Sequence, residues 1–170
     1  MTVAIDQEFS REFAQAMPLR GWALAVSGQG EEGIAQIHQG LAAYRATGAT
    51  SDRPEHLALL AEASAQVGQT GAGLEALGEA LATVAQSAAR WWEAELHRLR
   101  GELLLQHSVA SPEGAETCFQ QALDVARRQE AKALELRAAL SLSRLRQQHG
   151  KRDKARELLA KANAGESFSE

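Results

Sequence analysis

One pattern of small and large side chains returns four times along this chain of 170 residues, and it restricts the possible folds strongly. A small residue is followed four positions later by a larger apolar residue, and three positions after that by another small one. Such positions lie on one stripe of an α-helix. The twelve residues are Gly33, Gly73, Ala115 and Ala155, then Ile37, Leu77, Phe119 and Leu159, then Gly40, Ala80, Ala122 and Ala162.

A second helix in each repeat is indicated upstream, where Gly21, Ala61 and Gly101 recur 40 residues apart. Small residues let two helices approach closely, while the large residue fills the space between them. A single helix pair cannot bury its apolar face alone, so successive pairs must stack. The sequence predicts an all-α protein, a right-handed superhelical solenoid of about four antiparallel helix pairs, each 40–42 residues long.

The segment Gly28-Gln-Gly-Glu-Glu-Gly33 also matches the G-x-G-x-x-G pattern of dinucleotide-binding loops. That reading requires a preceding strand and a parallel sheet, and no further strands are found to build one. Gly28, Gly68 and Gly150 occupy equivalent places in the repeat. They suit the left-handed residue that ends a helix. We therefore interpret these glycines as turns within helix pairs and expect no cofactor.

The periodicity predicts nine helices, near 6–17, 18–27, 31–46, 54–67, 71–87, 91–107, 112–128, 132–149 and 151–163. Pro18 would start the second of these or kink a single longer helix. Asp52 and Ser111 precede prolines and are candidate capping residues. The expected organisation is an N-terminal helical segment over 1–17, a helical repeat domain over 18–163 and a flexible tail over 164–170.

Composition limits the possible functions. No stretch approaches the roughly 20 apolar residues that cross a bilayer, and no signal peptide is recognised, so neither a membrane partner nor secretion is predicted. A single cysteine, Cys118, excludes an internal disulfide and fits a cytoplasmic location. The formal net charge of −4 disfavours nucleic acid as a partner.

Three segments carry a more specific resemblance: residues 19–49, 92–105 and 135–160, the last reading ELRAALSLSRLRQQHGKRDKARELLA. The small-large-small signature resembles tetratricopeptide repeats (TPR), although the period is 40 rather than 34 residues. Over residues 18–160 the chain looks like the C-terminal repeat region of large bacterial signalling proteins. Those proteins join an adenylate/guanylate cyclase or a DNA-binding output domain to a signalling ATPase. No phosphate-binding loop of the G-x-x-x-x-G-K-[ST] type occurs here.

No catalytic or metal-binding constellation is evident. The five histidines are dispersed without an i,i+4 pair, and Cys118 alone cannot complete a zinc site. Cys118 is expected to be a small buried thiol. Acidic residues such as Glu93 and Glu95 are interpreted as helix-start charges. The chain is thus predicted not to be an enzyme.

The first helix of each pair would line the concave face of a TPR array, where a peptide or partner domain can lie. The candidates fall in three registers of the repeat: the residue after each recurring small position, the residue one turn later and the residue one turn earlier. The set lacks the Lys/Asn/Arg combination that TPR co-chaperones use to hold a carboxylate, so no chaperone partner is predicted. The candidate partner-binding residues are Trp22, Glu62, Gln66, Arg98, Glu102, Gln106, Arg144 and Gln148.

Charge is distributed unevenly along the chain. Residues 1–126 carry 7 basic and 16 acidic side chains, whereas residues 127–161 carry 11 basic and 4 acidic ones. The leading hypothesis is a protein-interaction domain that acts as a scaffold or sensor in a bacterial signalling protein. The alternative is an assembly module in which the acidic body of one copy binds the basic last repeat of another, giving a homo-oligomer.

Overall fold

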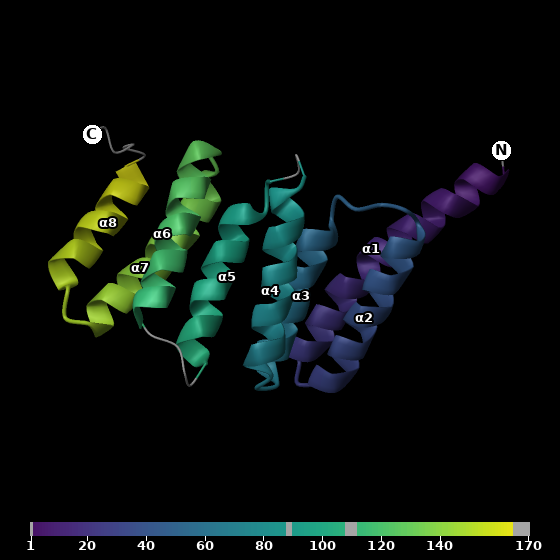
Figure 1. Cartoon of the computed structure of the whole chain (residues 1–170), viewed down its shortest axis with the longest axis horizontal. Coiled ribbons are helices and arrows are strands. Elements are labelled where there is room, and N and C mark those ends of the chain that lie inside the picture. The colour runs from purple at the N-terminus through teal and green to yellow at the C-terminus, as the bar shows by residue number, and fades with distance from the viewer. Residues whose placement is uncertain (1, 88–89, 108–111, 165–170) are drawn as a thin grey trace. The chain divides into compact units, whose positions relative to one another are not determined.

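The computed structural model describes residues 2–87, 90–107 and 112–164, and within these ranges the chain is all-α, as predicted (Figure 1). The described residues contain eight helices. They are α1 (Thr2–Val26), α2 (Gly30–Ala46), α3 (Arg53–Gln66), α4 (Thr70–Ala85), α5 (Glu93–Gln106), α6 (Pro112–Arg128), α7 (Lys132–Gln148) and α8 (Arg152–Ala164).

The chain divides into two compact units, Met1–Ala89 and Arg90–Glu170. Unit 1 contains the pairs α1/α2 and α3/α4, and unit 2 contains the pairs α5/α6 and α7/α8. In each unit the first helices of the two pairs also contact one another, α1 with α3 and α5 with α7. Within each unit this arrangement is that of a helical repeat, because the first pair packs against the second. The single repeat domain expected over 18–163 stays a prediction.

The small residues of the pattern lie where helices approach most closely. A Cβ on Gly21 of α1 would lie 2.6 Å from the Gly33 carbonyl oxygen and 2.7 Å from Cγ1 of Ile37, both on α2. In unit 2, a Cβ on Gly101 would lie 2.5 Å from the Phe119 ring. Ile37, Leu77 and Phe119 have no exposed surface. The structure thus confirms the small-large-small pattern in the first three repeats.

The last repeat departs from the pattern at its large position. Leu159 is only partly buried, and the neighbouring Leu158 takes the buried place, with 6% of its surface exposed. Leu158 joins an apolar core that unit 2 builds from α6, α7 and α8. This core contains Ala115, Phe119, Ala122, Leu123, Ala138, Ala139, Leu142, Leu145, Leu158 and Ala162.

Gly28 of the G-x-G-x-x-G segment and the equivalent glycines of two other repeats end helices, as predicted. Gly28, Gly68 and Gly150 have φ angles of +94°, +77° and +75°. After each glycine the next backbone N–H donates to a carbonyl five residues back, as Gln29 N does to Leu24 O at 3.0 Å. This left-handed turn terminates a helix and directs the chain into the next one. G-x-G-x-x-G is therefore a turn between α1 and α2.

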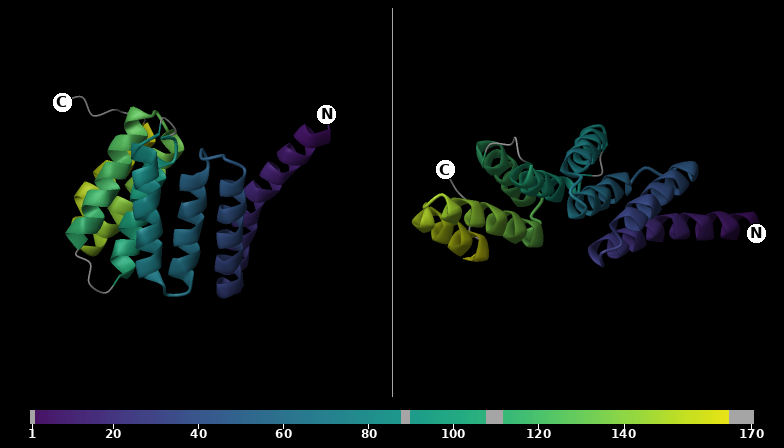
Figure 2. Two further views of the ribbon diagram at one scale, coloured as in Figure 1. Left: turned by 45° about the vertical axis from the view of Figure 1, so that its right-hand side comes forward. Right: turned by 90° about the horizontal axis from the view of Figure 1, so that it is seen from below.

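The N-terminal half decides between the two alternatives for Pro18 and contradicts the expected cap at Asp52. The segments 6–17 and 18–27 form one longer helix, α1, whose N-terminal part projects beyond α2 (Figures 1 and 2). Pro18 is accommodated because Gly40 of α2 leaves room for its ring; a Cβ on Gly40 would lie 2.6 Å from Pro18 Cδ. Asp52 precedes α3 but makes no side-chain capping bond. Ser111, the other expected cap, lies outside the described residues.

Candidate functional site

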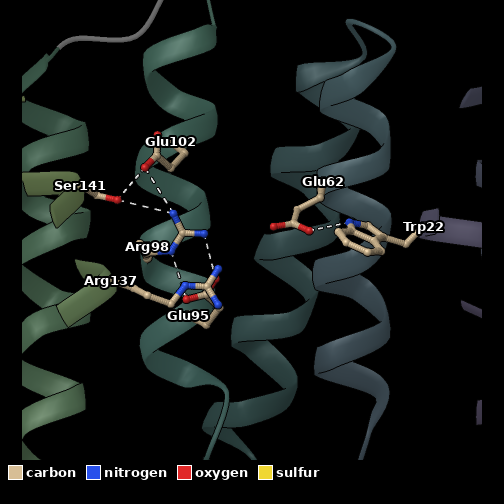
Figure 3. Close-up of polar contacts among 7 residues, drawn as sticks. All are labelled: Trp22, Glu62, Glu95, Arg98, Glu102, Arg137 and Ser141. Atoms are coloured by element: carbon tan, nitrogen blue, oxygen red, sulfur yellow. Dashed lines mark hydrogen bonds and ion pairs between the residues drawn. The ribbon is translucent and has the colours of Figure 1, made fainter. Parts of the chain in front are cut away.

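In unit 1, the face shared by α1 and α3 carries a hydrogen bond between equivalent repeat positions. Trp22 Nε1 donates to Glu62 Oε2 at 2.7 Å, and the two residues are 40 positions apart (Figure 3). Both side chains are partly buried. The repeat thus places two predicted partner-binding residues next to each other, with the indole ring and a carboxylate edge still partly open to solvent.

At the other end of this face, Asp52 fixes the connection between α2 and α3. Its carboxylate accepts hydrogen bonds from Gln15 of α1 and from the Tyr44 hydroxyl of α2, the latter at 3.1 Å. Burial raises the pKa of Asp52, but the hydrogen bonds from Gln15, Ser51 and Tyr44 outweigh burial and hold it below its ordinary value. Asp52 therefore stays ionised and ties three helices together, which explains why it does not cap α3.

His56 of α3 lies beside this network with 3% of its surface exposed. Its ring meets the Tyr44 ring edge-on, with centroids 4.9 Å apart. Burial lowers the pKa of His56 below its ordinary value; the nearby Asp52 charge opposes this effect and Arg53 adds to it. His56 is therefore neutral at pH 7 and belongs to the packing of unit 1.

In unit 2, the face shared by α5 and α7 carries a denser network (Figure 3). Arg98 pairs with Glu95 at 2.8 Å and with Glu102 at 3.3 Å, all on α5. From α7, the Ser141 hydroxyl donates to Glu102 at 2.6 Å, and Arg137 pairs with Glu95 at 2.8 Å. Polar side chains therefore link the first helices of the two pairs across this face.

The remaining predicted site residues are exposed. Gln66 follows Glu62 by one turn on α3, and Gln106 follows Glu102 by one turn on α5. Arg144 and Gln148 lie one turn apart on α7. All four side chains are available to a partner, and their involvement in binding remains a prediction.

Sequence reasoning missed three members of the unit 2 network: Glu95, Arg137 and Ser141. Glu95 lies in the first turn of α5, as its interpretation as a helix-start charge predicts, but it is also 2% exposed and paired with both Arg98 and Arg137. The i,i+3 and i,i+4 spacing of Glu95, Arg98 and Glu102 is a recognisable signal for ion pairs along one helix. The contacts from α7 carry no comparable signal, because they join residues about 40 positions apart.

Cys118 is buried, as predicted, and burial raises the pKa of its thiol. It is therefore a packing residue of α6 in its protonated form. Across the described ranges, no group of three or more His, Cys, Asp or Glu side chains is placed to hold a metal ion. A helix with both the length and the apolarity needed for a membrane crossing is likewise absent from these ranges.

Comparisons with known proteins define the class. No family model matches the chain. The crystal structure of MamA superposes on 89% of this chain and 77% of its own chain, with a TM-score of 0.57 and 16% sequence identity. A kinesin light chain from Podosopora anserina with nearly identical TPR-like repeats gives a TM-score of 0.45 at 20% identity, over 88% of this chain and 93% of its own. The likeness to MamA shows the fold alone, an all-α helical repeat.

A relative in sequence is much longer. An uncharacterized protein of Rhizobium meliloti (strain 1021) is 29% identical over 131 residues, which is 77% of this chain. The chain spans 13% of the length of that relative.

Proposed function

We propose that this chain is a non-enzymatic protein-interaction domain that binds a peptide or a partner domain on the faces that its first helices form in each unit. The observation that carries the proposal is the polar face on α1 and α3 of unit 1 and its counterpart on α5 and α7 of unit 2, each seen by itself in Figure 3. Partly buried, hydrogen-bonded side chains lie on α1, α3, α5 and α7, and exposed glutamines lie one turn further along three of these helices. TPR-like folds generally bind protein partners, and these helices would line their concave groove.

The chemistry of the face fits a polypeptide ligand. Gln66, Gln106 and Gln148 each offer a donor and an acceptor, which matches the alternating N–H and C=O groups of a peptide backbone. The Trp22 indole supplies flat apolar surface that loses little conformational entropy on binding. Hydrogen bonds already hold Trp22 and Glu102 in place, so their ordering cost is met before the partner arrives.

The biological setting belongs to the same proposal. The resemblance to the repeat region of cyclase and transcriptional-regulator signalling proteins supports a scaffold or sensor role in a bacterial signalling protein. The Rhizobium relative supports a context in which such repeats form one part of a much longer chain. We place the domain in the cytoplasm, where it would act by capturing a protein partner.

Reversing charge on the proposed face tests this function. Wild-type protein and the double variant Glu62→Lys/Glu102→Lys are used to capture proteins from a lysate of the source organism. Glu62 accepts a bond from Trp22, and Glu102 pairs with Arg98, so the substitutions change the face chemically. We expect the double variant to lose proteins that the wild type retains at high salt. Glu62→Gln should keep them, because an amide oxygen can still accept from the indole.

The matched control is Glu75→Lys/Asp124→Lys, which reverses two exposed charges on the second helices α4 and α6. Circular dichroism establishes that all variants are folded. If the control variant loses the same partners as Glu62→Lys/Glu102→Lys, or if neither loses any, the face is not the binding site and the proposal fails.

A further inference from the structure

The repeat gives α1, α5 and α7 a common register. Gly21 of α1 stands seven residues before Gly28, and Ser143 of α7 stands seven residues before Gly150. Gly101 of α5 occupies the same repeat position, 80 residues after Gly21 and 42 before Ser143. Ser143 is 1% exposed and donates to the Ala155 carbonyl of α8 at 3.1 Å. Gly21 approaches the Gly33 carbonyl of α2 in the same way. Equivalent positions in the three helices can therefore be compared directly.

In α1 and α5, one face of the helix is covered by the first helix of the following pair. On α1, Gln15 bonds to Asp52 and Trp22 bonds to Glu62 of α3. On α5, Arg98 and Glu102 bond to Ser141 of α7. This covered face is a recurring contact surface of the repeat, and it is where stacking continues from one pair to the next.

The same face of α7 is largely exposed, although Arg137 on it already pairs with Glu95 of α5. It carries Leu136, Arg137, Leu140 and Arg144, which are equivalent to Ala94, Glu95, Arg98 and Glu102 of α5. Leu136 and Leu140 are 38% and 41% exposed, whereas Ala94 is 1% exposed. Among the described helices, none follows α8 to cover this face. We call these four residues the open end.

The first helix of a further helix pair would fit the open end, and α1 of a second copy is such a helix. The register equates Ser141, which covers Arg98, with Leu19 of α1. It equates Asp52, which covers Gln15, with Glu12 of α1. Leu19 is 51% exposed and Glu12 is exposed. Both side chains are therefore available on the surface of the molecule.

We propose that copies of this chain associate head to tail, with α1 of one copy packing on the open end of α7 in the next. Continuing the register places Leu19 against Leu140, which joins two exposed apolar side chains. It also places Glu12 beside Arg137, which keeps its pair with Glu95 and is 52% exposed, and the Trp22 ring against Arg144. Glu12 and Arg137 carry opposite charges, and Trp22 with Arg144 makes a cation–π contact.

The charge distribution favours this occupant. Residues 1–126 carry an excess of acidic side chains and residues 127–161 an excess of basic ones, so the basic last repeat of one copy attracts the acidic body of another. The contact is heterologous, because the two surfaces differ, and it can extend beyond a dimer. Association should weaken as salt rises, since the charges at a contact edge are screened.

Sedimentation velocity of Leu140→Glu and Leu19→Glu tests the proposal, because each variant keeps one intact end. We expect wild-type protein to sediment faster as its concentration rises, and each variant alone to remain monomeric. An equimolar mixture of the two variants should form a dimer, since intact α1 of the Leu140→Glu protein meets intact α7 of the Leu19→Glu protein. High salt should shift wild-type protein towards monomer.

The control variant is Leu105→Glu on α5, where the leucine is also 41% exposed but does not belong to either end. It should associate like wild type. A wild-type protein that is monomeric throughout overturns the proposal. So does a mixture of the two end variants that stays monomeric, since that result indicates a contact between identical surfaces. These outcomes leave the proposed partner-binding function untouched.

Discussion

At the scale of single residues, Gly21 shows how closely the repeat packs its helices. The main-chain oxygen of Gly33 would lie 2.6 Å from a Cβ at this position, and backbone cannot move aside as a side chain can. Gly78, on the exposed side of α4, has open space around it. The two glycines therefore place the same residue type in opposite environments.

We predict that Gly21→Ala destabilises the protein by about 1 to 3 kcal/mol, because overpacking outweighs the gain in helix propensity of about 1 kcal/mol. Gly78→Ala should instead stabilise by up to about 1 kcal/mol. Urea unfolding monitored by circular dichroism measures both. Equal effects of the two substitutions would contradict the close approach of α1 and α2.

His56 predicts a pH dependence of the stability of unit 1. Burial lowers its pKa in the folded state, so the unfolded chain takes up the proton first as the pH falls. The free energy of unfolding should be constant above about pH 7 and decrease as the pH falls below 6.5, the ordinary histidine value. The depressed pKa of Asp52 acts only in more acidic solution, because its ordinary value is 3.8.

The free energy of unfolding, measured with urea at about pH 7.5 and about pH 5.5, checks this pH dependence. His97 of α5, whose pKa burial also lowers, contributes a similar loss in unit 2. His56→Leu should therefore remove part of the difference between the two pH values and leave the part due to His97. If His56→Leu leaves the whole difference in place, His56 is not the group that titrates.

At the scale of elements, the ion pairs of the buried Glu95 connect α5 with α7. The Glu95 side chain is 3% exposed and depends on Arg98 and Arg137. The Arg98 side chain is 12% exposed and the Arg137 side chain 52% exposed. Removing a partner from a buried charge is costly, whereas an exposed partner contributes little.

We predict that Arg98→Ala costs about 2 to 4 kcal/mol in the free energy of unfolding, because it leaves Glu95 buried with less compensation. Arg137→Ala should cost less than about 1 kcal/mol. The comparison is made by urea unfolding of unit 2, followed through Trp91 and Trp92 fluorescence. A larger loss for Arg137→Ala than for Arg98→Ala would show that Glu95 is held mainly from α7.

The helices themselves were largely predictable from the sequence. The stripe of small and large residues placed α2 to α8 with bounds that differ from the structure by at most two residues. Helix periodicity is a local property, so it can be read from a short window. The sequence left open whether Pro18 starts a helix or lies within one, because its place within α1 depends on Gly40, a residue of another helix.

The candidate site was predictable only in part, for a similar reason. The 40-residue period places Trp22 and Glu62 at equivalent positions, but their hydrogen bond depends on how α1 and α3 pack. The burial of Glu95 depends on Arg137, which comes from another helix pair. Side-chain contacts between repeats thus need the tertiary structure, even where the repeat itself is clear.

At the scale of the whole molecule, one repeated unit accounts for both the core and the proposed binding face. The second helices bury the large residues of the first three repeats, and within each unit the two first helices contact each other through polar side chains. The likeness to MamA shows that this fold is shared at 16% sequence identity. At that distance only the fold is transferred, so the partner must be found by experiment.

Site-specific photocrosslinking measures partner binding on this face most directly. A photoreactive amino acid replaces Gln66, Gln106 or Gln148 on the first helices, or the exposed Gln39 or Gln120 on the second helices. After irradiation in the source organism, the account predicts the same partner crosslinked at the three first-helix positions and absent from the other two. Crosslinks that come equally from both sets, or from Gln39 and Gln120 alone, would contradict it.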